Sequence, residues 1–109
     1  MKTSKHIVVL VTAKDKKEAR KIAGVLLEAQ LIACANILQG IESVFRWQGK
    51  IDHASEALLV MKTKRSLFKK ISAQVKAVHS YSTPEIIALP MVEGDSEYLK
   101  WIDASVVRS

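Results

Sequence analysis

Two side chains in the C-terminal third of the sequence have the types and spacing of metal ligands. His79 and Glu85 lie six residues apart, in a segment that Pro84 stiffens. Imidazole nitrogen and carboxylate oxygen both bind divalent transition metals, and copper(II) heads the divalent affinity series for such ligands. The spacing therefore predicts a weak copper site at His79 and Glu85. The alternative is that His79 caps carbonyl groups or bonds a neighbouring subunit, because two ligands alone rarely hold a metal ion tightly.

Cys34 is the only cysteine and the third candidate metal ligand. As a thiolate it could bind a metal ion, but a cysteine in a predicted strand is more often a small buried hydrophobe. An enzyme could pair Cys34 as nucleophile with His79 as base. That chemistry also needs an orienting group and an oxyanion site, and the sequence marks neither. We therefore expect a protein that is not an enzyme.

Hydrophobic periodicity predicts the elements that position these residues. The run His6–Thr12 is continuously apolar and β-branched, as is typical of a central strand covered on both faces. Asp15, at the N-cap position, and Glu18 three residues later form a capping box. This pattern predicts a helix over Asp15–Gln30. A strand pattern begins at Ile32, and Gln39-Gly40 interrupts it with a bulge or bend.

The second half of the sequence predicts a hairpin, two further helices and one more strand. Gln48-Gly49 marks the hairpin tip, and a long return strand follows over Ile51–Thr63. Ser66 is placed to cap a helix that ends near His79. The short apolar run Thr83–Val92 has a proline near each end, which favours an edge strand, and a last amphipathic helix follows it.

This order of elements, β-α-β-β-α-β-α, predicts an α+β fold, a ferredoxin-like split βαβ sandwich with a long hairpin. The sequence has 109 residues, too few for two hydrophobic cores, so we expect one domain over residues 1–109. In the return strand Leu58 and Val60 alternate with Leu59 and Met61, so both of its faces are apolar. Two helices cover only one face, and we expect copies of the chain to pack on the other.

The formal net charge of +6 raises the question of nucleic-acid binding. Most of the basic residues fall on the polar faces of the predicted helices, where solvated charges are common. A ferredoxin-like RNA-binding domain also needs aromatic side chains on its central strands. The strand His6–Thr12 and the return strand through Met61 contain no Phe, Tyr or Trp. We therefore expect no nucleic-acid partner.

Composition also predicts where the chain works. Its apolar runs are far shorter than the roughly 20 residues that cross a bilayer, so we expect no membrane partner. The first residues lack the pattern of a signal peptide. A single cysteine cannot form an intramolecular disulfide, which agrees with a reducing compartment. The expected location is the cytoplasm.

Five motifs, in this order and spacing, resemble those of the CutA family. They are Ala33-Cys34-Ala35-Asn36-Ile37-Leu38, Trp47-Gln48-Gly49-Lys50-Ile51, Lys62-Thr63-Lys64, the tract His79–Pro90 and Tyr98-Leu99-Lys100-Trp101-Ile102. The resemblance covers Ile7 to about Val106. Family members usually have proline and an acidic or amide residue at the positions of Ser80 and Ser82, and some have a cysteine at Val11. A metal site that used that thiolate would be weaker here.

The resemblance implies a ferredoxin-like subunit in a tight homotrimer, similar in fold to the PII signalling proteins, with hairpin strands that pair between subunits. It also implies a role in tolerance of divalent metal ions, copper in particular. Four residues that match the motifs are expected near a subunit boundary, where they line a pocket for an anion or small ligand or pack the interface. These are Trp47, Lys62, Tyr81 and Trp101. The alternative is a PII-like signalling trimer that binds a nucleotide or another small anion, although no glycine-rich phosphate loop is present.

Overall fold

Four antiparallel strands form one sheet in the order β2-β3-β1-β4 in this computed structural model, which describes residues 4–108. The strands are β1 (His6–Ala13), β2 (Cys34–Trp47), β3 (Lys50–Lys64) and β4 (Ile86–Pro90). The apolar run of β1 lies between β3 and β4, and the proline-flanked β4 lies at an edge. Both placements confirm the sequence-based predictions of a central strand at His6–Thr12 and an edge strand within Thr83–Val92.

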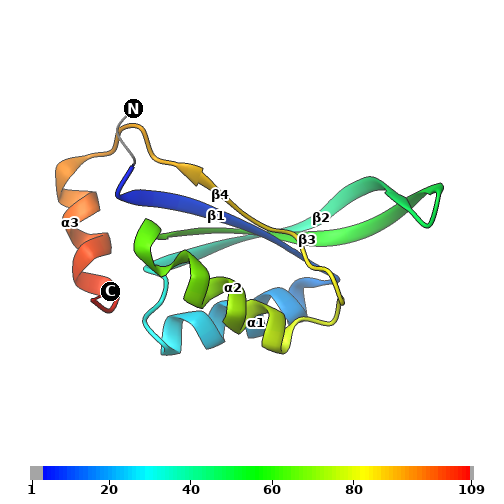
Figure 1. Cartoon of the computed structure of the whole chain (residues 1–109), viewed down its shortest axis with the longest axis horizontal. Helices are drawn as coiled ribbons and strands as arrows, with labels where there is room; N and C mark the ends of the chain where they lie inside the picture. Colours follow the sequence, from blue (N-terminus) through cyan, green and yellow to red (C-terminus); the bar gives the residue numbers. More distant parts are fainter. Residues whose placement is uncertain (1–3, 109) are drawn as a thin grey trace.

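Two helices cover one face of the sheet, and the third lies at its end (Figure 1). The helices are α1 (Lys16–Glu28), α2 (Phe68–Val78) and α3 (Ser96–Ser105). The core between the sheet and the first two helices is fully buried and contains Val9, Val11, Ile22, Leu26, Leu59, Met61, Ile71 and Val75. This strand order with two helices on one face confirms the predicted α+β, ferredoxin-like fold. None of the described helices is both long and apolar enough to cross a membrane.

Helix α1 begins where the sequence predicts and ends two residues early. Asp15 is the N-cap, and its carboxylate accepts a hydrogen bond of 2.8 Å from the Glu18 N–H. At the other end Gln30 has a φ of 56°, and the Leu31 N–H donates back to the Leu26 carbonyl at 2.9 Å. A residue in the left-handed conformation together with this hydrogen bond back to the last turn is a Schellman motif. It ends the helix before Gln30.

The start of α2 corrects the prediction that Ser66 is its N-cap. Ser66 lies inside a short 3-10 turn, Arg65–Leu67, and the residue that precedes α2 is Leu67. The Arg65 N–H donates to the carbonyl of Lys5, just before β1, at 2.8 Å, so the chain is held beside the start of β1 where it turns. A tight 3-10 turn absorbs this change of direction before the α-helix begins. The predicted end at His79 is confirmed, since His79 is the C-cap.

Strands β2 and β3 form a hairpin that extends well beyond the helices (Figure 1). Its register shifts between Leu38 and Ile41, and Gly40 there has a φ of 72°, which confirms the expected bulge. At the tip Gln48 and Gly49 both have positive φ, of 50° and 76°, as a type I′ turn requires. The hairpin is therefore bent at its middle and closed by a two-residue turn.

Gly49→Ala is expected to destabilise the protein by about 1–2 kcal/mol, the cost of a Cβ in the left-handed region. No atom lies within 4 Å of a Cβ built at Gly49, so the cost comes from the backbone alone. The matched control is Gly24→Ala within α1, where a Cβ also meets nothing and helix propensity favours alanine by about 0.5–1 kcal/mol. Chemical denaturation of both variants checks the opposite signs, and equal effects would contradict the turn assignment.

The face of the sheet opposite α1 and α2, called here the open face, is apolar. Its apolar side chains are Val8, Leu10, Leu38, Leu58, Val60, Ile87 and Leu89, which the strand register places on one side, with Asn36 and Lys62 at one end of the same face. Leu38, Ile87 and Leu89 are 47%, 47% and 50% exposed. Helix α3 reaches only one end of this face, where the Tyr98 hydroxyl lies 3.7 Å from Cys34 Sγ. Within a single chain much of this apolar surface is in water, which is unfavourable.

Candidate functional site

The side chain of His79 is fully buried at the end of α2, and both of its ring nitrogens have hydrogen-bond partners. Its Nε2 lies 2.7 Å from the carbonyl oxygen of Thr12, which can only accept, so Nε2 carries the proton. Its Nδ1 accepts a hydrogen bond of 3.0 Å from the Tyr81 N–H. The imidazole therefore links α2, β1 and the loop that follows α2. A metal ion at Nδ1 would have to replace the hydrogen bond from Tyr81.

Glu18 fixes the same loop from the side of α1. Its Oε1 accepts from the Lys14 N–H at 3.0 Å, and its Oε2 accepts from the Ser80 N–H at 2.8 Å. Oε1 also lies 3.9 Å from His79 Nδ1. Burial would raise the pKa of Glu18, but the hydrogen bonds from Lys14 and Ser80 outweigh it and lower the pKa. Glu18 is thus an ionised, hydrogen-bonded anchor for the start of the loop.

The loop and the hairpin together form a pocket of about 730 Å³. It is lined by Thr12, Ser43, Val44, Phe45, Trp47, Asp52, Glu56, Tyr81, Ser82, Thr83 and Glu85. The Tyr81 hydroxyl donates a hydrogen bond of 2.6 Å to Glu56 Oε2 and so joins the loop to β3. Cavities of this size are typical of sites for small ligands.

The pocket lining is negative and partly aromatic. Asp52, Glu56 and Glu85 supply carboxylates, and no Lys, Arg or His is among the lining residues. Glu56 is only 7% exposed. Burial, the hydrogen bond to Glu56 and the nearby carboxylate charges raise the pKa of Tyr81 far above its usual value, so its hydroxyl remains a donor. The electrostatics of this pocket favour a cation.

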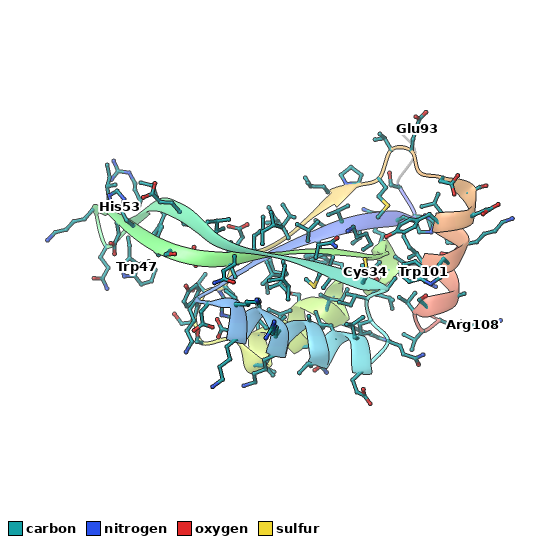
Figure 2. All side chains as sticks on the ribbon, turned by 180° about the vertical axis from the view of Figure 1, so that it is seen from behind. Cys34, Trp47, His53, Glu93, Trp101 and Arg108 are labelled. Atoms are coloured by element: carbon teal, nitrogen blue, oxygen red, sulfur yellow. The ribbon has the colours of Figure 1, made fainter. Side chains whose placement is uncertain are left out.

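The seven residues proposed from the sequence fall into two groups. Trp47, Tyr81 and Glu85 line the pocket, and His79 supports the loop beneath it. Cys34, Lys62 and Trp101 lie elsewhere: Figure 2 shows Trp47 near the hairpin tip and Cys34 with Trp101 towards the opposite end of the molecule. A single chain therefore does not bring the two groups together.

The second group is held together at the junction of β2, β3 and α3. Cys34 pairs with Lys62 across the two strands, and the Lys62 ammonium donates to the Asn36 side chain. The Tyr98 ring lies 5.4 Å from that of Trp101, between centroids. The hydrogen bond to Cys34 is the main cause that raises the pKa of Tyr98. This cluster is mixed in polarity, and its exposed aromatic rings resemble a contact surface.

No three His, Cys, Asp or Glu side chains among residues 4–108 come together to hold one metal ion. The metal site at His79, Glu85 and Cys34 thus stays a prediction. Phe45, Asp52 and Glu56 were missed as pocket residues. Strand alternation places Phe45 on the same face as Trp47, and Asp52 is its cross-strand partner, so the pattern did contain a signal.

Comparison with known proteins decides the family. A family model described as CutA1 divalent ion tolerance protein matches residues 7–105. The chain belongs to the CutA1 family. The divalent-cation tolerance protein CutA of Thermus thermophilus is 47% identical to this CutA1 chain over 95 residues, which cover 87% of the chain and 92% of that protein.

Further relatives agree in sequence and in fold. The Arabidopsis thaliana protein CutA, described as chloroplastic, is 43% identical over 95% of this CutA1 chain, which spans 57% of the length of that protein. The crystal structure of CutA1 from Oryza sativa superposes with a TM-score of 0.94 at 43% identity and covers 98% of each chain. These matches confirm both the family resemblance and the fold class predicted from the sequence.

Proposed function

We propose that this chain is a divalent-cation tolerance protein that works as a cytoplasmic homotrimer and binds copper(II) or another divalent ion weakly, as part of a response to metal ions. The observation that carries the proposal is a pocket with three carboxylates and no basic side chain, in a chain whose formal net charge is +6. A negative pocket in a basic protein selects cations. Family membership supports the same class of ligand.

The open face supports assembly into a trimer. Burying its apolar side chains between subunits would gain about 25 cal/mol for each Å² removed from water. Both β2 and β4 are edge strands, with N–H and C=O groups that a neighbour can pair. A closed ring of three copies would satisfy these edges without an open end that could grow into a filament.

A trimer also explains why the candidate site residues are divided. If the hairpin of one subunit lies across the open face of the next, its Trp47 approaches the neighbour's surface around Cys34, Lys62 and Trp101. The pocket with Glu85 would then face a second set of candidate ligands. In this arrangement the site is complete only between two subunits, and a divalent ion would recruit donors from both.

The PII-like alternative, a nucleotide or small-anion site, has less support. Phosphate binding needs cationic side chains or clustered backbone N–H groups, and the pocket lining has no Lys, Arg or His. Lys62 lies in the other group of residues, with Asn36 as its hydrogen-bond acceptor. Stabilisation by ATP and not by copper in a thermal-shift assay would favour this alternative.

Calorimetric titration with copper(II) tests the metal proposal. Glu85→Gln is expected to weaken binding by on the order of tenfold, because it removes one anionic oxygen donor. His79→Ala tests the imidazole in the same titration. The matched control is Glu42→Gln, an exposed residue of the β2–β3 hairpin that does not line the pocket. Equal affinities for the wild type and Glu85→Gln would show that the pocket is not part of the metal site. Equal affinities for the wild type and His79→Ala would show that the imidazole is not a ligand.

A further inference from the structure

The net charge of the chain is concentrated on one side of the sheet. The helix layer, defined here as residues 14–30 and 65–78, contains α1, α2 and the turns beside them, and it covers the face of the sheet opposite the open face (Figure 1). Of the 17 basic and 11 acidic residues of the chain, this layer contains nine basic and three acidic ones, so eight of each remain elsewhere. The helix layer therefore carries the whole formal net charge of +6.

The basic side chains of the helix layer are exposed and lack acidic partners. None of them is in an ion pair among residues 4–108. Of the three acidic residues, Glu18 is buried and bonded to the loop after α2, Asp15 caps α1, and Glu28 lies at the far end of α1. The surface is thus strongly positive. Its nine basic residues are Lys14, Lys16, Lys17, Arg20, Lys21, Arg65, Lys69, Lys70 and Lys76.

The positions of these charges are unfavourable for the two helices themselves. Lys16 and Lys17 occupy the first turn of α1. Lys69 and Lys70 occupy the first turn of α2, and the last turn of α1 contains no basic residue. Positive side chains near a helix N-terminus are repelled by the positive end of the helix dipole. A charge pattern that opposes local stability is typical of residues that serve a function.

The two helices present this charge at both ends of the layer. The Glu18 carboxylate, near the start of α1, accepts a hydrogen bond from the Ser80 N–H just after α2. The start of α1 therefore lies beside the end of α2, and the helices are antiparallel. Their basic N-terminal turns are separated by roughly the length of a helix, about 15–20 Å. A ligand that satisfies both turns has to be an extended polyanion.

The chemistry of the surface favours a nucleic-acid backbone over other polyanions. Exposed lysines contribute little to protein–protein contacts, where they are depleted. Membrane-surface helices insert large apolar side chains, and Leu27 is the one exposed large apolar side chain in residues 14–30 and 65–78. Neutralising the phosphates of a duplex releases its condensed counterions, and this gain requires neither apolar nor aromatic contacts.

We propose that the helix layer binds the phosphate backbone of double-stranded nucleic acid without reading its sequence. The expectation of no nucleic-acid partner was argued from base stacking on the central strands, and this mode uses the helices and no base contact. The helix layer faces away from the open face, so the surface stays accessible when subunits pack there. The inference does not depend on the proposed metal site.

Fluorescence anisotropy of the whole chain with a labelled DNA duplex of about 20 base pairs tests the proposal. At about 50 mM salt we expect a dissociation constant of about 1–100 μM, equal for two unrelated sequences. Contact with about five phosphates would give a slope of about −4.5 for the logarithm of the association constant against that of the salt concentration. No binding at about 50 mM salt, or a preference for one sequence, would overturn the proposal. So would equally tight binding to polyglutamate, or binding to phosphatidylserine vesicles at a salt concentration that releases the duplex.

Two double variants with the same loss of charge locate the surface. Lys17→Gln with Lys21→Gln removes two cations from the helix layer and should make the salt slope shallower by about two, with about tenfold weaker binding at about 100 mM salt. The control, Lys100→Gln with Arg108→Gln, removes the same charge from exposed residues in α3 and after it, and should change binding much less. Circular dichroism of both should match the wild type, because every substituted side chain is exposed. Equal losses in the two variants would refute the assignment to the helix layer.

Discussion

Glu18→Gln is expected to lower the free energy of unfolding by about 1.5–3 kcal/mol at pH 7, the usual value of hydrogen bonds to a charged group. Both oxygens of the Glu18 carboxylate accept backbone N–H bonds, from Lys14 and from Ser80. An amide has one oxygen, so its NH₂ group would face one of these donors in a buried site. Urea denaturation at a fixed protomer concentration measures the loss.

The pH dependence of the stability difference between the wild type and Glu18→Gln identifies the cause of that difference. The folded protein holds the pKa of Glu18 below its ordinary value of 4.5, so the ionised carboxylate contributes stability above that pH. That contribution is lost as the pH falls through the lowered folded-state pKa. The difference between wild type and Glu18→Gln should therefore be constant near neutral pH and shrink in acid. The control Glu28→Gln, exposed on the same helix, should change stability by less than about 0.5 kcal/mol. A difference that persists unchanged in acid would assign the loss to packing.

Leu38→Glu is expected to convert the assembled protein into monomers. Leu38 is 47% exposed on the open face, where the proposed trimer buries it. Burial of a leucine contributes about 1.5–3 kcal/mol, and an unpaired carboxylate in its place would add the cost of a buried charge at every copy of the interface. Sedimentation velocity at micromolar concentration measures the oligomeric state.

Leu27→Glu is the matched control for this experiment. Leu27 is 44% exposed, close to the value for Leu38, but it lies on α1, on the opposite side of the sheet. The same substitution there should leave the oligomeric state unchanged. Dissociation by both variants would mean that the helix layer also forms contacts between subunits. Dissociation by neither would exclude Leu38 from the interface and weaken the case for a trimer built on the open face.

The fold could be predicted largely from the sequence because its main signals are local. The β-branched run of β1, the Asp15 cap and the Gln48-Gly49 turn each reflect interactions within a few residues. Ser66 was misassigned because the turn that contains it is held by Lys5, a residue some sixty positions away. A capping pattern cannot include a hydrogen bond from so distant a segment.

The site was harder to predict because its contacts also join segments that lie far apart in the sequence. The sequence marks His79 as a residue capable of metal binding, but it does not show that Thr12 and Tyr81 occupy both of its nitrogens. Residues 12 and 79 meet only in the folded chain. The pocket likewise joins Glu56 to Tyr81, from segments that the sequence separates by 25 residues. Alternation along the hairpin places Phe45 on the same face as Trp47, and the two-residue turn at Gln48-Gly49 sets the register that pairs Phe45 with Asp52.

The two edge strands have a consequence for newly made protein. In the proposed trimer these strands are paired with neighbours, but before assembly β2 and β4 present rows of unpaired backbone groups beside apolar side chains such as Leu38 and Leu89. Such edges template pairing with any extended chain, so aggregation competes with correct assembly. Because correct assembly depends on the concentration of folded subunits, slow or sparse synthesis would lengthen the time each chain spends exposed. The yield of intact oligomer should thus depend on expression rate and temperature as well as on the stability of the fold.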